Sequence, residues 1–147
     1  MSFALDPRLE ADSFSLGPIP GGEVRLHRNA HYLWLILIPH VPEDVRDWHE
    51  VPREVRLRLS DQLATLSELV KEELPADKVN VATIGNMVPQ LHLHVIGRRR
   101  SDPAWPGVVF GHPDVREYDA AERDDRLGTL RAHLLRLLPP SGNSEGY

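Results

Sequence analysis

Cysteine is absent from this chain of 147 residues. Disulfide bonds, thiolate metal ligands and cysteine nucleophiles are therefore excluded. The longest apolar run, at residues 32–39, is far shorter than the roughly 20 residues needed to span a bilayer. The N-terminal residues 1–20 include acidic residues and prolines where a signal peptide needs a basic start and an apolar core. We therefore expect a cytoplasmic protein.

Positive charge is also scarce. The chain has 17 lysine and arginine residues and 22 aspartate and glutamate residues, which gives a formal net charge of −5. Proteins that bind nucleic acid or membrane surfaces usually present a basic face, so neither is an expected partner. A small anionic ligand remains compatible with local positive groups. The length fits one domain over residues 1–147, with residues 140–147 expected to fray.

Hydrophobic periodicity predicts the secondary structure. Apolar residues at spacings of three and four over residues 55–74 predict a long helix, and the Gly- and Pro-rich residues 17–22 predict a turn. The other predicted elements are helices at residues 6–12, 44–48 and 127–137 and strands at residues 23–28, 32–38, 78–84 and 91–97. Because the strands follow one another in pairs, the order favours an α+β fold with an antiparallel sheet.

The most informative segment is residues 90–96, in which Gln90, His92 and His94 alternate with apolar residues. Successive side chains of a strand point to opposite faces of the sheet. The amide and the two imidazoles are therefore expected to project together toward a cleft or solvent, while the leucines and valine between them are buried. Such a row of polar side chains predicts a functional site.

This segment resembles the signature of the histidine triad (HIT) family, in which three histidines alternate with hydrophobic residues and two further hydrophobic residues follow. The resemblance implies a HIT-like domain with an antiparallel sheet of about five strands, one long helix and a C-terminal helix. Residues 86–94 and 102–107 are together similar to a bacterial subgroup of HIT-like hydrolases. Gln90 stands where the first triad histidine is expected, and Trp34 where many relatives place a fourth histidine.

HIT proteins are nucleotide hydrolases or nucleotidyl transferases, usually homodimers whose sheets continue across the interface. The resemblance implies cleavage at the α-phosphorus of a dinucleoside polyphosphate or a nucleoside phosphoramidate. His92 would be the nucleophile that forms a nucleotidyl-histidine, which water then hydrolyses. His94 would be a hydrogen-bond donor and general acid, and Gln90 would orient the phosphate or His92. No cofactor is required, although a divalent cation could accompany a polyphosphate substrate.

Three asparagines are the nucleotide-binding residues that the resemblance implies. Asn29 resembles the residue that binds the ribose, Asn86 resembles the group that contacts phosphate, and Asn80 would support the base or ribose side. The alternative for each is an asparagine that caps a turn. The arginine run at residues 98–100 could attract a polyphosphate, but a charge run at the end of a strand is usually solvated. Trp34 is expected in the core.

The residues leave three alternatives open. His92 and His94 could be two ligands of a metal-dependent enzyme, with a third ligand from His31, His112 or Asp102. The protein could instead be a nucleotide-binding module with little or no turnover, since Gln90 cannot transfer a proton. Both histidines could also simply pack in the core.

Overall fold

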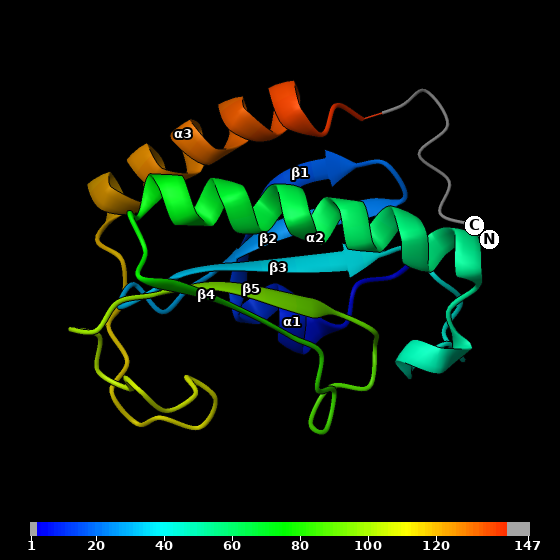
Figure 1. The fold of residues 1–147 in the computed structure, drawn as a ribbon, viewed down its shortest axis with the longest axis horizontal. Coiled ribbons are helices and arrows are strands. Elements are labelled where there is room, and N and C mark those ends of the chain that lie inside the picture. The colour runs from blue at the N-terminus through cyan, green and yellow to red at the C-terminus, as the bar shows by residue number, and fades with distance from the viewer. Residues whose placement is uncertain (1–2, 141–147) are drawn as a thin grey trace.

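A computed structural model describes residues 3–140 of the chain (Figure 1). The predicted frayed tail at residues 140–147 lies outside this range except for its first residue. The described residues form one five-stranded sheet in the order β1-β2-β3-β5-β4, with every neighbouring pair antiparallel. This confirms the α+β class. The strands are β1 (Ser13–Ile19), β2 (Gly22–His27), β3 (Leu33–Pro39), β4 (Lys78–Ala82) and β5 (Leu93–Arg98).

The helices are distributed over both faces of the sheet. The long helix α2 (Arg53–Glu73) runs across one face, and α3 (Ala120–Leu137) lies beside it against β1 (Figure 1). The short helix α1 (Pro7–Ala11) begins as predicted, with the Asp6 carboxylate accepting a hydrogen bond from the backbone N–H of Arg8. A single 3-10 turn, η1 (Trp48–Glu50), precedes α2.

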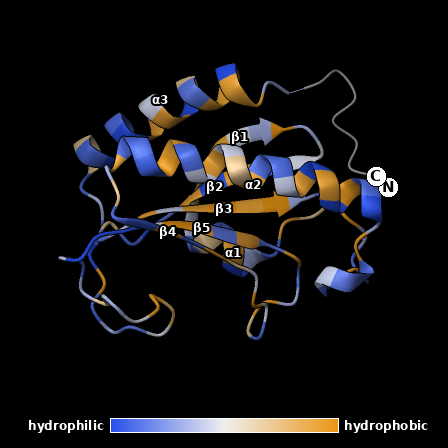
Figure 2. Cartoon of the chain, viewed as in Figure 1, coloured by the Kyte–Doolittle hydropathy of each residue, from blue (hydrophilic) through white to orange (hydrophobic). Residues whose placement is uncertain are grey.

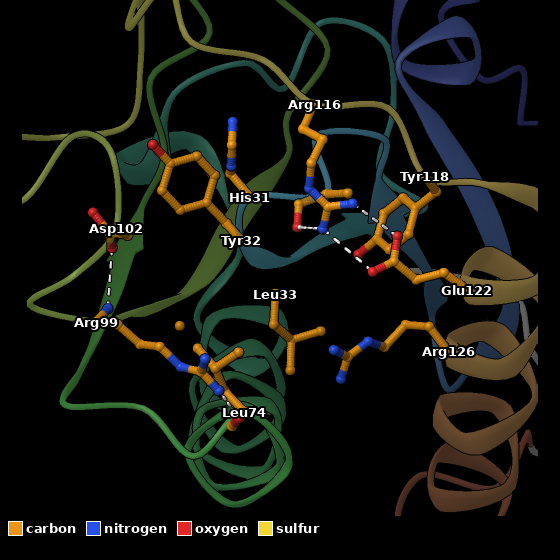
Figure 3. Close-up of a pocket in the computed structure, with 12 residues that line it drawn as sticks. His31, Tyr32, Leu33, Leu74, Arg99, Asp102, Arg116, Tyr118, Glu122 and Arg126 are labelled. Carbon is orange, nitrogen blue, oxygen red and sulfur yellow. Dashed lines mark hydrogen bonds and ion pairs between the residues drawn. The ribbon is translucent and has the colours of Figure 1, made fainter.

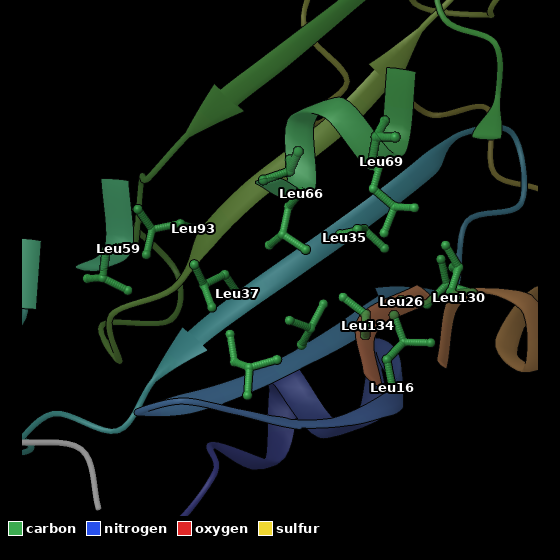
Figure 4. Packing of buried hydrophobic residues seen from close by; sticks show 14 of the residues in the cluster. Leu16, Leu26, Leu35, Leu37, Leu59, Leu66, Leu69, Leu93, Leu130 and Leu134 are labelled. Carbon is green, nitrogen blue, oxygen red and sulfur yellow. The ribbon is translucent and has the colours of Figure 1, made fainter. Parts of the chain in front are cut away.

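The central strand β3 is buried along its whole length, as its apolar run predicted, and Figure 2 shows most of it in the orange of hydrophobic residues. Leu33, Leu35 and Leu37 of β3 belong to the core cluster under α2 and α3. Figure 4 shows Leu35 and Leu37 on this side, facing Leu66 of α2. Its even-numbered residues Trp34, Ile36 and Ile38 belong to a second cluster with α1. The two faces of β3 therefore belong to two separate layers.

The predicted turn at residues 17–22 is too wide, because residues 17–19 belong to strand β1 and Gly22 begins β2. Gly17 has a φ of +112° and lies where the pairing with β2 shifts register, so it forms a β-bulge. Proline is tolerated at residue 18 because β1 is an edge strand. The actual turn to β2 is confined to residues 20–21.

Other boundaries differ in smaller ways from the prediction. The helix predicted at residues 44–48 is replaced by η1, and the strand predicted at residues 78–84 ends at Ala82. The strand with the histidines begins at Leu93 instead of residue 91, and α3 begins at Ala120 instead of residue 127. Periodicity therefore located most of the elements but missed β1, and it did not predict all of their ends.

A buried ion pair between Arg98 and Asp102 lies at one end of the sheet. Arg98 is only 2% exposed, and its Nε and Nη2 donate to the two carboxylate oxygens of Asp102 at 2.9 and 3.0 Å. Its Nη1 donates to the side-chain oxygen of Asn80 at 2.9 Å, and its guanidinium lies near the rings of Tyr32 and Trp105. This residue of the arginine run is therefore not solvated. It joins β4, β5 and the loop that begins near Asp102.

Substituting Arg98 by Met should lower the free energy of unfolding by about 3 to 5 kcal/mol, because Asp102 would stay buried without its counter-ion. Arg100→Met, at an exposed neighbouring position, is the control and should change stability by less than about 0.5 kcal/mol. Equilibrium denaturation by urea measures both. Equal losses in the two variants would contradict a structural role for the buried pair.

Candidate functional site

The two histidines lie side by side on the face of the sheet opposite α2. His94 pairs with Ile36 of β3, and His92 lies just before β5 begins. Their ring centroids are 4.9 Å apart. The imidazoles therefore project together, as the alternation predicted. The exposed fractions of His92 and His94 are only 6% and 7%, so the pair is covered and does not face open solvent.

The backbone determines the tautomer of His92. Its Nδ1 lies 2.7 Å from the carbonyl oxygen of Gln90. A carbonyl oxygen only accepts hydrogen bonds, so Nδ1 carries the hydrogen and Nε2 keeps its lone pair. This is the state that an imidazole needs to attack an electrophile through Nε2.

A different donor determines the tautomer of His94. The indole Nε1–H of Trp34 donates to His94 Nδ1 at 2.9 Å, so the hydrogen of His94 lies on Nε2. Burial, and then the neighbouring His92 and His27, lower the pKa of His94 to about 3. At neutral pH, His94 is therefore an uncharged hydrogen-bond donor. Trp34 is buried as expected, and it also contacts the site directly.

Sequence reasoning missed two aromatic side chains that enclose the histidines. The ring of His27 stacks on Trp34 with centroids 3.8 Å apart, and burial followed by the charge of Arg28 lowers its pKa to about 4. Phe110 contacts His94 and Trp34 at centroid distances of 4.9 and 5.6 Å. The register that pairs Leu26 with Leu35 could have located His27, because its extension by one residue places His27 opposite Trp34. No local sequence pattern indicates that Phe110 contacts the histidines.

The side chain of Gln90 forms hydrogen bonds with the backbone of the segment that precedes α1. Its Oε1 accepts from the backbone N–H of Asp6, and its Nε2 donates to the carbonyl oxygen of Ala4, both at 2.8 Å. The main-chain carbonyl, and not the amide side chain, is the group that contacts His92. Gln90 therefore holds the N-terminal segment beside the histidines and orients His92 through the backbone.

Asn29 is buried at the connection between β2 and β3. Its Oδ1 accepts from the backbone N–H groups of His31 and Arg116 at 3.1 and 3.3 Å. Its own backbone N–H donates to Nδ1 of His27 at 3.0 Å. Asn29 therefore holds the turn, contacts the C-terminal segment and lies next to one of the rings of the site.

The other two asparagines lie apart from the imidazoles. The side-chain oxygen of Asn80 accepts from Arg98 in the buried ion-pair network. Asn86 is exposed in the connection between β4 and β5. Of the three predicted nucleotide-binding residues, the structure thus brings only Asn29 close to the ring cluster through His27.

The residues considered for metal binding have other partners. His31 Nε2 lies 2.8 Å from a carboxylate oxygen of Asp114, and Asp102 binds Arg98. Within residues 3–140, no group of three or more His, Asp or Glu side chains is arranged to hold a metal ion. In the same range, no helix is both long and apolar enough to cross a membrane.

A pocket of about 300 Å³ lies away from the histidines (Figure 3). Gly97 of β5 contributes to its lining, roughly 10 Å along the strand from His94 and on the alternate face. Arg99 donates to the carbonyl of Leu74, and Arg116 forms an ion pair with Glu122. The lining of this pocket includes three arginines, Asp102 and Glu122, but neither His92 nor His94.

The match to a known family agrees with this geometry. Residues 8–101 match the family model of the HIT domain, so the chain belongs to the HIT family. Family membership supports a nucleotide-binding or hydrolase function of the HIT type.

Solved structures resemble the chain over nearly its whole length. A histidine triad protein from Marinobacter aquaeolei VT8 is 39% identical, with a TM-score of 0.87, over 93% of this chain and 99% of its own. Histidine triad proteins from Bradyrhizobium japonicum and Sinorhizobium meliloti 1021 are 34% and 31% identical, with TM-scores of 0.85 and 0.82. These matches cover 90% and 93% of this chain and 98% of each relative. Among curated proteins, no match to the chain is found.

Acid should destabilise the protein through His27 and His94. Their folded-state pKa values of about 4 and about 3 lie below the usual 6.5, so between these values the unfolded chain binds more protons. Their contribution to stability is complete above pH 6.5 and is lost as the pH falls. Lowering the pH from 7 to 5 should cost about 2 kcal/mol through His94 alone.

Urea denaturation of wild type, His94→Gln and His49→Gln at pH 7, 6 and 5 measures this dependence. The loss of stability between pH 7 and 5 should shrink in His94→Gln and stay unchanged in His49→Gln, because His49 is exposed. The same pH dependence in all three proteins would contradict the expectation.

Proposed function

We propose that this protein is a HIT-type phosphohydrolase that cleaves a nucleotide at its α-phosphorus through His92. The observation that carries the proposal is the 2.7 Å contact between His92 Nδ1 and the carbonyl oxygen of Gln90. This contact leaves Nε2 as the free nucleophilic nitrogen and holds the ring in one orientation. Membership of the HIT family supports the same chemistry.

In the proposed first step, His92 Nε2 forms a bond to the α-phosphorus as the bond to the leaving group breaks. The modified imidazole gains positive charge, which the hydrogen bond from Nδ1 to the Gln90 carbonyl stabilises. His94 Nε2–H would donate to a phosphoryl oxygen. In the second step, water attacks the phosphorus, releases the mononucleotide and restores neutral His92. This route uses no metal bound by the protein, and a divalent cation would enter with a polyphosphate substrate.

The roles of the remaining predicted residues follow from their contacts. Gln90 would position His92 and the N-terminal segment, and Asn29 would support the ribose side of the nucleotide near His27. Asn86, exposed on the β4–β5 connection, would contact phosphate only once a substrate is bound. Asn80 would act indirectly, through Arg98.

His92→Ala should lower mononucleotide release by at least about a thousandfold, because it removes the nucleophile. The test incubates wild type, His92→Ala and the exposed control His49→Ala with a panel of dinucleoside polyphosphates and nucleoside phosphoramidates. Mass spectrometry then measures the products and any nucleotidyl adduct on His92.

Release that depends on His92 but not on His49 would support the proposal. Substantial activity in His92→Ala would overturn it. Binding of nucleotide by wild type without release would instead favour a nucleotide-binding module with little turnover, since Gln90 and Trp34 replace two groups that could transfer protons.

We also propose that two copies pair through β4, continuing the sheet. β4 has no further strand beside it among residues 3–140, and unpaired edges favour association. Val81 on β4 is 48% exposed, and Ile84 just beyond it is 45% exposed. Val81→Lys should therefore shift the protein from dimer to monomer in light scattering, whereas Leu135→Lys, at an exposed position on α3, should not. A wild-type monomer would refute this pairing.

A further inference from the structure

Hydrogen bonds in the histidine site limit which protons it can supply. His94 Nδ1 accepts the indole hydrogen of Trp34 at 2.9 Å. An imidazole that carries its hydrogen on Nε2 becomes an imidazolium only by gaining a proton at Nδ1. Trp34 Nε1 and His94 Nδ1 would then both carry a hydrogen at a separation of 2.9 Å, and the two hydrogens would repel each other. His94 therefore keeps a single hydrogen, and giving it away would leave a strongly basic imidazolate.

The neighbouring groups do not replace this missing acid. The Gln90 amide cannot transfer a proton at neutral pH, and both of its ends already bind the backbone of the N-terminal segment. His27 Nδ1 accepts the backbone N–H of Asn29, and its ring is stacked on Trp34. The hydrogen on His92 Nδ1 is held by a carbonyl oxygen. The site donates hydrogen bonds, but none of these four side chains is placed to release a proton.

The lack of a side chain among these four that can release a proton distinguishes phosphoanhydride substrates from phosphoramidate substrates. When His92 Nε2 bonds to the α-phosphorus, the leaving group departs with the electron pair of the broken bond. The polyphosphate released from a phosphoanhydride departs as a stable oxyanion. The amine of a phosphoramidate needs a proton as the P–N bond breaks, because an amide anion is too basic to form in water.

Resting on the proposed function, we infer that the substrate is a nucleoside phosphoanhydride, whose leaving group departs as an oxyanion without a proton from the protein. In this assignment Trp34 is a positioning residue. It keeps His94 as a neutral donor to the phosphoryl oxygen and prevents His94 from acting as an acid. The low pKa of His94 agrees with this geometry.

The test uses aryl esters of adenosine and guanosine 5′-phosphate whose phenols have pKa values from about 5 to about 10. Without proton donation, wild-type kcat/KM should fall by about five- to tenfold for each unit of phenol pKa, and with a general acid by about twofold or less. Trp34→Phe frees His94 Nδ1, so the dependence should become shallower. Phe110→Leu is the matched control, because Phe110 contacts His94 without a hydrogen bond, and the steep dependence should remain.

A shallow dependence in wild type, or the same steep dependence in Trp34→Phe, would overturn the inference while leaving the proposed function intact. Absence of turnover by wild type would overturn the proposed function and the substrate class together. ¹⁵N NMR of the histidine rings tests the positioning role without turnover. Wild type should show unprotonated Nδ1 on His94 at pH 6, and Trp34→Phe should shift the tautomer and raise the pKa of His94. Identical spectra would refute the role of Trp34.

Discussion

The antiparallel register of β3 and β5 is the constraint on which the site depends. Ile36 pairs with His94, so Trp34, two residues earlier on β3, lies diagonally across from that histidine on the same face. Diagonal neighbours in a sheet are within reach of large aromatic side chains, which explains how the indole reaches His94 Nδ1. A slip by one residue would turn His94 toward α2 and remove the contact. The apolar layers on both faces of β3 oppose such a slip.

One neutral hydrogen-bond acceptor and one neutral donor set the tautomers of the two histidines in this site. The Gln90 carbonyl and the Trp34 indole each select one tautomer, and the two selections are complementary. His92 is left with a free lone pair on Nε2, and His94 is left with a hydrogen on Nε2. The proposed nucleophile and a hydrogen-bond donor are thereby oriented by two neutral groups. Fixed dipoles of this kind need little reorganisation during a reaction.

The sequence predicted the parts of the fold that rest on local periodicity. The long helix, the buried strand β3 and the common face of His92 and His94 follow from the spacing of apolar residues. Strand β1 was missed because a bulge at Gly17 interrupts its alternation and Pro18 suggests a turn. The contacts of Gln90 with Ala4 and Asp6 join residues more than 80 positions apart, and no pattern within one segment encodes them.

The same reasoning explains why the burial of Arg98, one member of the arginine run, was not predicted. A charge run at the end of a strand gives no sign that one member is buried, because burial depends on partners such as Asp102 and Asn80. The loop that begins near Asp102 continues to Phe110, whose ring packs on His94. The ion pair therefore helps to hold one wall of the site, although it lies at the far end of β5. Burial is the main cause of the low pKa of His94, and Phe110 is one of the side chains that contact this ring, so we expect the loop held by the ion pair to contribute to that burial.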